Sequence, residues 1–268
     1  QIQSFYNSLQ SAGLSSKTVR NIHGIIHATM KQAMRLGYIK INPTEVCTLP
    51  RWTKKDIKVL DDKAVAAFLA AIEGDRYEAI YFIDLFTGMR QSEILGLTWD
   101  MVNFKDGTIS ISKQLLRERK RQGTYYLDTT KNDKTRIIKP APVVMAKLKE
   151  HKWQQTEWQL KAGPAWSNEW NLVFTDEVGH HLIHLTVYRH YKAIVEVIGE
   201  GDSRFHDLRD SYAVASLRDG DDVKVLQQNM GNHSTAFTLD TYAHVTKQMQ
   251  EDSAARMEEY IKGIIGDK

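Results

Sequence analysis

The sequence predicts a mainly α-helical protein with a small antiparallel sheet, organised as a small all-α domain followed by a larger α+β domain. Three observations favour this fold class. Apolar residues recur at helical spacing through most of the chain, and alternation of apolar with polar residues is confined to residues 107–140. An Asn-Pro break at 42–43, followed by a basic stretch over 44–58, separates the first helix from the rest. We therefore expect domains over residues 1–56 and 57–268.

The first expected helix covers residues 16–36. Ser15 and Ser16 are candidate N-caps, and Gly37 is a plausible stop. The apolar positions at helical spacing are Val19, Ile22, Ile26, Met30 and Met34. This segment would form the body of the small N-terminal domain.

Further helices are expected at the start of the second domain. Val65, Phe68, Leu69 and Ile72 share one helical face, and the strongly apolar residues 77–87 predict a buried helix. Thr87-Gly88 interrupts that helix, which resumes over 91–97.

The sheet is expected between residues 107 and 140. Ile109 and Ile111 alternate with polar residues, Gly123 indicates a turn, and residues 135–138 have a strand-like composition. The remainder, residues 141–268, is expected to be mostly helical, with loops at Gly163-Pro164 and Val178-Gly179.

The net charge of +3 is unevenly distributed along the chain. Residues 1–58 carry nine Lys or Arg against Glu45 and Asp56, a balance of +7, so residues 59–268 sum to −4. Residues 105–139 are also basic, with ten Lys or Arg against four Asp or Glu. A basic segment joined to a near-neutral one is typical of a protein that grips a polyanion, although a solvated basic face is the alternative.

Composition excludes several other classes of protein. No apolar run approaches the roughly 18 residues of a membrane-spanning helix. The single cysteine, Cys47, excludes an internal disulfide and a cysteine-rich zinc site, and fits a reducing cytoplasmic setting. The chain begins at Gln1 without a basic-then-apolar leader, so we expect the first domain to be truncated at its N-terminus.

Four short segments contain the residues that could carry chemistry. They are Thr87–Glu93, Thr129–Lys134, His206–Arg209, and Gly231–His233 leading to Leu239–Tyr242. In this order and at these separations they resemble the tyrosine recombinase (phage integrase) family, over essentially the whole chain. The stretch Phe237–Val245 is similar to integrases of conjugative transposons.

These residue types suit the cleavage of a phosphodiester without a metal. A tyrosine can attack phosphorus and keep the bond energy in a phosphotyrosine, but its ordinary pKa of about 10 calls for a base or a cationic surrounding. Two arginines can fork onto the non-bridging oxygens, where negative charge grows in the transition state. A lysine can protonate the departing 5′ oxygen.

The resemblance implies a role for each matching residue. Tyr242 would be the nucleophile, and Arg90 and Arg209 the two clamp arginines. Lys131 would be the general acid, His206 would assist proton transfer, and Glu93 would support the first arginine. Taken alone, each of these residues would more often be an ordinary surface or core residue.

The resemblance also implies partners. The first domain would be the core DNA-binding domain and the second the catalytic domain, together clamping double-stranded DNA. We expect a homo-oligomer, a tetramer on paired recombination sites, an accessory protein for excision, no cofactor, no metal and no membrane. The candidate DNA-contacting residues are Lys17, Arg20, Lys31, Arg35, Lys54, Lys55, Lys134 and Arg136.

Two positions leave alternatives open. Lys134 competes with Lys131 for the role of acid, and we favour Lys131 because the family places its lysine after residues such as Thr129-Thr130. After Gly231 the family usually has histidine, but this chain has Asn232, with His233 one residue later. Either Asn232 takes a donor role, or a local shift brings His233 into the site.

Three other activities are considered beside recombination. A type IB topoisomerase would share the chemistry but lack a partner strand. A DNA-binding regulator without catalysis is suggested by Asn232. A metal nuclease is suggested by His180 and His184, which are four residues apart, although packing or DNA contact are the favoured roles of these histidines.

The last expected helix lies over residues 250–265. Its apolar residues, at roughly helical spacing, are Ala254, Ala255, Met257, Tyr260, Ile261 and Ile264. Such a face either packs on its own domain or docks on a neighbouring subunit. By resemblance, C-terminal segments exchange between the subunits of similar integrases.

Overall fold

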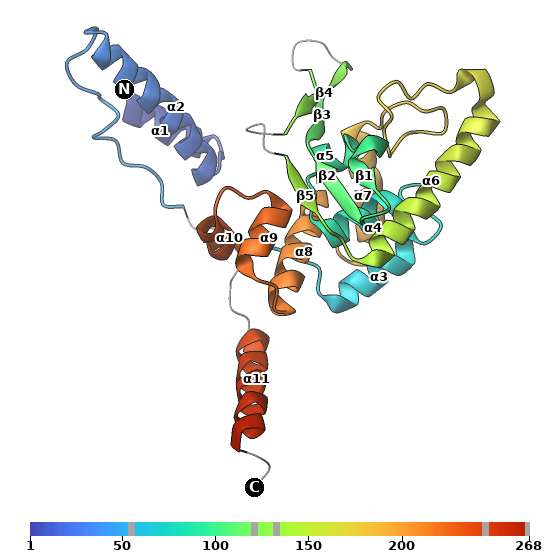
Figure 1. Cartoon of the computed structure of the whole chain (residues 1–268). Coiled ribbons are helices and arrows are strands. Elements are labelled where there is room, and N and C mark those ends of the chain that lie inside the picture. Colours follow the sequence, from blue (N-terminus) through green and yellow to red (C-terminus); the bar gives the residue numbers. More distant parts are fainter. Residues whose placement is uncertain (53–56, 119–122, 131–134, 243–246, 266–268) are drawn as a thin grey trace. The chain divides into compact units, whose positions relative to one another are not determined.

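The computed structural model describes the chain except for residues 53–56, 119–122, 131–134, 243–246 and 266–268. The chain divides into two compact units, Gln1–Asp56 and Ile57–Lys268, and each is considered by itself (Figure 1). Helices dominate both units, and the strands among the described residues all lie between Val102 and Ile138. The predicted fold class, mainly α with small antiparallel sheets, is confirmed.

The first unit is built on a pair of helices, α1 (Ile2–Ser11) and α2 (Ser16–Arg35). α2 begins where the sequence predicts, and the Ser15 side chain caps it by accepting a hydrogen bond from Thr18 N (3.2 Å). Tyr6 of α1 and Val19 of α2 are fully buried between the two helices. α1 was not among the predicted helices.

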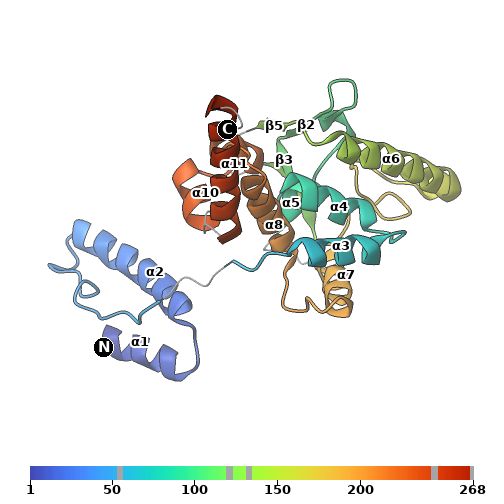
Figure 2. The ribbon, with the colours of Figure 1, turned by 90° about the horizontal axis from the view of Figure 1, so that it is seen from below.

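The second unit begins with three helices around a buried aromatic core. They are α3 (Asp62–Ile72), α4 (Glu78–Thr87) and α5 (Gln91–Leu95). α4 packs against α3, α5, α6 and α8 (Figure 2). The rings of Phe68, Tyr81, Tyr191 and Phe205 pack with centroids 5.6–6.0 Å apart. This core holds α4 in place and so sets the position of the Thr87-Gly88 turn at its end.

The strands form two small sheets rather than the single one expected. After the short 3₁₀ helix η1 (Trp99–Met101), β1 (Val102–Asn103), β2 (Thr108–Ile111) and β5 (Arg136–Ile138) form an antiparallel sheet in the order β1-β2-β5. β3 (Lys113–Arg117) and β4 (Tyr125–Thr129) form a separate hairpin. The hairpin packs against α5, and the approach is so close that a Cβ on Gly96 would lie 2.5 Å from Leu115 N. Ile109 and Ile111 are buried, as their alternation predicts.

The rest of the second unit is helical. Its elements are α6 (Pro142–Ala162), η2 (Gly163–Ala165), α7 (His184–Val197), α8 (Phe205–Arg218), α9 (Val223–Met230), α10 (Thr235–Tyr242) and α11 (Lys247–Ile265). α8, α9 and α10 pack on one another, and α9 also contacts β5. Within the described ranges, no helix has both the length and the hydropathy to span a bilayer.

Candidate active site

Arg90 is placed by a tight turn between α4 and α5. Gly88 ends α4 with φ 60°, a left-handed conformation that favours glycine. A Cβ at Gly88 would also lie 2.4 Å from the ring of Tyr212, so a larger residue has no room. Two residues later Arg90 is the N-cap of α5, and its backbone N donates to the Glu93 carboxylate (2.9 Å). The turn therefore fixes both the backbone and the direction of Arg90.

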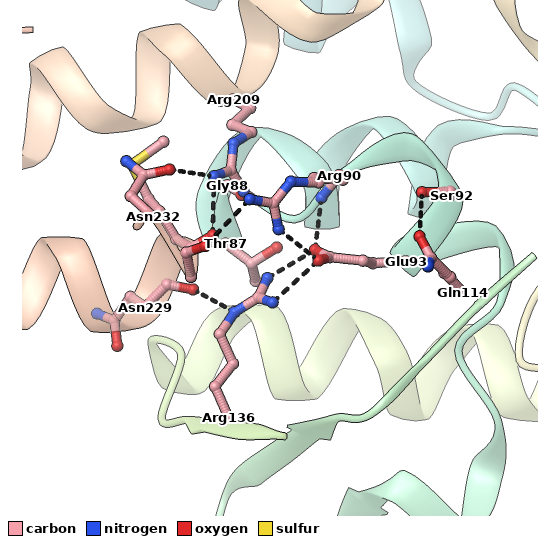
Figure 3. A network of polar contacts seen from close by, with 12 residues as sticks. Thr87, Gly88, Arg90, Ser92, Glu93, Gln114, Arg136, Arg209, Asn229 and Asn232 are labelled. Carbon is pink, nitrogen blue, oxygen red and sulfur yellow. Dashed lines mark hydrogen bonds and ion pairs between the residues drawn. The ribbon is translucent and has the colours of Figure 1, made fainter. Parts of the chain in front are cut away.

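Glu93 is a buried carboxylate held by two arginines (Figure 3). Arg90 Nη1 donates to its Oε1 (2.7 Å), and Arg136 donates to both oxygens (3.0 and 2.6 Å). Burial alone would raise the pKa of Glu93, but the hydrogen bonds and charges of Arg136 and Arg90 outweigh it and lower the pKa to about 2. Glu93 is therefore ionised at neutral pH and keeps the Arg90 side chain in place.

Arg209 lies on α8 and is almost fully buried. Its Nη1 donates to Gly88 O, and its Nη2 donates to Met230 O (2.8 Å) and Asn232 Oδ1 (2.9 Å). Burial and the charge of Arg90 lower the pKa of Arg209 to about 10. The guanidinium therefore stays charged at neutral pH, in surroundings where its charge is little screened.

The end of α9 brings three arginines together. Three consecutive backbone carbonyls each accept a hydrogen bond from a different guanidinium. The pairs are Arg136 Nε to Asn229 O (2.8 Å), Arg209 Nη2 to Met230 O (2.8 Å) and Arg90 Nη2 to Gly231 O (3.0 Å). The last carbonyls of a helix lack partners inside it and form the negative end of its dipole, so cations here satisfy them and offset their charge.

Gly231 and Asn232 shape the connection after α9. Gly231 caps the helix with φ 62°, and a Cβ there would lie 2.9 Å from Arg136 Nη1. The buried Asn232 accepts from Arg209 through Oδ1 and donates to Thr238 Oγ1 through Nδ2 (3.1 Å). His233 is exposed. Of the two alternatives that the sequence leaves open, this geometry favours Asn232 as the site residue.

Tyr242 is the last residue of α10 and is buried beside α8 and α9. Its ring packs with Ala213, Leu226 and Met230, and its hydroxyl donates to Asp210 Oδ1 (2.8 Å). Burial and the Asp210 carboxylate raise the pKa of Tyr242 above its ordinary value, while Arg209 acts in the opposite direction. The hydroxyl of Tyr242 is therefore held by Asp210, the residue that directly follows Arg209 on α8.

His206 lies one turn before Asp210 on α8. Its side chain is 55% exposed, and its Nε2 is 3.9 Å from Asp210 Oδ1. His206 and Tyr242 thus approach the same carboxylate from two elements. Of the two, only Tyr242 is hydrogen-bonded to it, whereas His206 lies at the distance of an ion pair.

Two candidate lysines of the loop between β4 and β5, Lys131 and Lys134, lie outside the described residues. The described flanks of that loop are Thr130, which is buried, and Arg136 at the start of β5. Arg136 is anchored to Glu93 and to the end of α9, so the far flank of the loop is fixed at the arginine cluster.

The internal contacts of Arg136 revise its expected role. We predicted a DNA contact, but its guanidinium has protein partners on all three nitrogens and its side chain is only 11% exposed. A phosphate would have to displace a buried carboxylate to reach it. The geometry therefore argues for a structural role and against direct DNA contact.

The other predicted DNA contacts lie in the first unit. Lys17, Arg20, Lys31 and Arg35 are carried by α2, and all four are exposed. Arg20 Nε donates to Pro50 O (2.9 Å), and Lys17 Nζ lies 5.8 Å from the centroid of the Trp52 ring. Lys54 and Lys55 fall outside the described residues.

The histidines near residue 180 have partners within the protein. His184 stacks on Tyr125 (5.7 Å between centroids), and His180 Nδ1 is 3.6 Å from Asp176 Oδ2. Within the part of the chain that the structure describes, no three His, Cys, Asp or Glu side chains are grouped as a metal would require. The stacking supports packing as the role of His184, whereas the His180 side chain is 59% exposed.

Sequence reasoning missed Asp210 as a member of the site, and it gave Arg136 a different role. Asp210 follows Arg209 and is four residues after His206, so helical spacing could have placed it on the same face as His206. Nothing in the sequence, however, signals that a residue 32 positions later reaches it. The Arg136 contacts span 43 and 93 residues and are equally invisible to local patterns.

Known proteins resemble this chain in sequence and in structure. Residues 58–249 match the model of the Phage integrase family. A "Tyrosine recombinase XerC-like" protein of Caldanaerobacter subterraneus subsp. tengcongensis is 27% identical, over 94% of this chain and 68% of its own length. The "ICEBs1 integrase" of Bacillus subtilis is 24% identical, over 97% of this chain and 70% of its own length. The chain thus spans roughly two thirds of these relatives.

Solved structures share the fold. The Tn1549 transposon integrase in complex with transposon right end DNA superposes with a TM-score of 0.80 at 21% identity, covering 96% of this chain and 84% of that one. A lambda integrase dimer bound to a COC′ core site superposes with a TM-score of 0.61 at 16% identity, covering 90% and 63%.

Proposed function

The chain belongs to the phage integrase family, whose members are tyrosine recombinases, and from that premise we propose that it moves a mobile element into and out of a genome. It cuts and rejoins DNA strands at specific sites through a 3′-phosphotyrosine link to Tyr242. The integrase of transposon Tn1549, which shares this fold, was solved with transposon end DNA, and the ICEBs1 protein is named an integrase. Both support an element of the conjugative-transposon type.

One observation carries the assignment of the site. Arg90, Arg209 and Tyr242 come from three separate elements, and all three gather at the end of α9. Two guanidinium groups beside a buried phenol match what cleavage of a phosphodiester without a metal requires. No cofactor is needed for this chemistry.

In the proposed reaction each residue has one task. Arg90 and Arg209 donate to the non-bridging oxygens of the scissile phosphate, whose charge grows as Tyr242 attacks phosphorus. Glu93 orients Arg90, and Asn232 orients Arg209. Lys131 donates a proton to the departing 5′ oxygen, and His206 assists proton transfer. The energy of the broken bond is kept in the phosphotyrosine and drives rejoining to a new 5′ end.

The basic first unit would supply affinity for DNA. The exposed cations of α2 can neutralise backbone phosphates, which makes binding sensitive to salt. We propose that residues 1–56 are a core DNA-binding domain and residues 57–268 the catalytic domain. We further propose that subunits assemble as a tetramer on paired sites, with an accessory protein for excision, in the bacterial cytoplasm, where the chromosome lies.

A suicide substrate tests the central assignment. A nicked DNA site that loses its 5′ end after cleavage should trap the protein covalently, and mapping of the linked peptide should identify Tyr242. Tyr242→Phe removes only the attacking oxygen, so it should abolish the adduct and leave DNA binding nearly unchanged. Cleavage that persists in Tyr242→Phe, with the adduct on another residue such as Tyr260, would contradict the proposal.

A further inference from the structure

The hydroxyl of Tyr242 makes a direct contact with a buried carboxylate. Asp210 is 5% exposed, lies next to Arg209 on α8, and accepts a hydrogen bond from Tyr242 Oη at 2.8 Å through Oδ1. Tyr242 itself is 6% exposed. The contact is therefore shielded from solvent, and its geometry is that of a proton donor and its acceptor.

The phenol needs a partner of this kind. Burial and the negative charge of Asp210 raise the pKa of Tyr242, so the phenolate is scarce at neutral pH. The proton must then leave while the oxygen attacks, because a neutral phenol is a weak nucleophile. A base in hydrogen-bond contact with Oη can receive that proton without rearrangement of the site.

We propose that Asp210 is a catalytic residue, the general base that takes the proton of Tyr242 during strand cleavage and returns it during strand joining. In cleavage, Tyr242 Oη forms a bond to phosphorus, the bond from phosphorus to the 5′ oxygen breaks, and the phenolic proton passes to Asp210 Oδ1. The 5′ oxygen takes its proton from a separate acid. In joining, a 5′ hydroxyl attacks phosphorus and gives its proton back to that separate group, while the bond from phosphorus to Oη breaks and Oη recovers its proton from Asp210.

The surroundings of Asp210 suit a base that must also give its proton back. His206 Nε2 lies 3.9 Å from Oδ1, Arg204 Nη2 lies 4.0 Å from Oδ2, and Asp207 is a further charge nearby on α8. Burial raises the pKa of Asp210, while His206, the Tyr242 hydroxyl and Arg204 oppose that rise. A carboxylate with a raised pKa holds a transferred proton better than a fully solvated one.

The first test replaces the carboxylate by its isostere. Asp210→Asn keeps the shape and an acceptor oxygen but removes the basicity, so single-turnover cleavage should fall about a hundredfold or more. DNA binding and thermal stability should change little. The matched control is Asp219→Asn, the same change at an exposed position at the end of α8, which should cleave at the wild-type rate.

Two further measurements separate a base from a merely structural residue. Wild-type cleavage should decline towards acid pH as Asp210 becomes protonated, and this limb should be absent in Asp210→Asn. A 5′-bridging phosphorothiolate, which needs no acid at the leaving group, should restore Lys131→Ala but leave the ratio between wild type and Asp210→Asn unchanged.

Cleavage by Asp210→Asn at or above the wild-type rate would overturn the proposal. It would mean that cleavage does not need the Asp210 carboxylate, or that the hydrogen bond from Tyr242 to Asp210 slows it. If the variant does not fold, the pH profile of cleavage is measured for a protein that keeps Asp210 and carries 3-fluorotyrosine, a more acidic phenol, at position 242. The acid limb should stay in place because it belongs to Asp210, and a limb that moves with the phenol's acidity refutes the role. The inference rests on Tyr242 as nucleophile, and an adduct mapped elsewhere in the wild-type protein would instead refute that premise.

Discussion

Glu93 shows how one buried carboxylate can order two cations. Its oxygens accept from the backbone and side chain of Arg90 and from both terminal nitrogens of Arg136. A lone buried charge would be costly, but here each oxygen meets a guanidinium. In the proposed reaction, Glu93 therefore acts on the phosphate only through Arg90.

Glu93→Gln should lower the free energy of unfolding by about 3 kcal/mol at neutral pH, because the largely buried Arg136 loses its carboxylate partner and Arg90 loses an ion pair. The folded pKa of about 2 is below the ordinary 4.5, so the wild-type advantage is present above pH 4.5 and is lost as pH falls towards 2. Denaturant unfolding of both proteins across this range measures it. A difference that stays constant down to pH 2 would contradict the ionised pair.

Arg90→Lys should reduce cleavage much more than DNA binding. The charge remains, but the planar fork that serves Glu93, Gly231 O and a phosphate at once does not. The loss should be about 2–4 kcal/mol in the activation free energy, as for removal of a fixed donor from an oxyanion site. Single-turnover cleavage at saturating protein gives the value, with the exposed Arg189→Lys as control. Unchanged cleavage would place Arg90 outside the phosphate site.

At the scale of elements, Arg136 links three segments that are distant in sequence. It starts β5, pairs with Glu93 of α5 and donates to Asn229 O of α9. The loop that contains Lys131 connects β4 to β5, and Arg136 is the first residue after it. This arginine therefore connects the flank of the lysine loop with the site of Arg90.

Arg136→Ala should destabilise the protein by about 3 kcal/mol, because Glu93 loses one of its two cations and Asn229 O its partner. Cleavage should fall further than affinity, since Arg90 and the lysine loop lose a shared anchor. Urea unfolding and single-turnover cleavage measure the two effects, beside the exposed Arg117→Ala on β3. Wild-type stability in the Arg136 variant would contradict its anchoring role.

The elements were predictable where the signal is local. Helical spacing located α2 and α4, and alternation located β2, because these patterns depend on neighbours a few residues apart. The four motifs gave the family, which the match to residues 58–249 confirms. The division into two sheets, the internal role of Arg136 and the Asp210 contact depend on packing between distant segments, which no local pattern encodes.

At the scale of the molecule, the last helix offers an apolar face. Met257, Tyr260, Ile261 and Ile264 of α11 are each at least 44% exposed. Truncation after Val245 should leave a folded protein that binds a single site but assembles poorly on paired sites, with altered cleavage, because docking energy exists only in the assembly. Native mass measurement on DNA is the check. Unchanged multimer formation would contradict the exchange of this helix between subunits. Gross unfolding would indicate that the helix packs on its own domain.

The three carbonyls at the end of α9 have a consequence for local opening of the native protein. Their arginines come from the α4–α5 turn, from β5 and from α8, so unwinding the last turn of α9 would break one hydrogen bond of each arginine at once. Amide protons of α9, α5 and β5 should then exchange with solvent together, as one cooperative unit. A bound phosphate analogue should slow exchange across that whole unit.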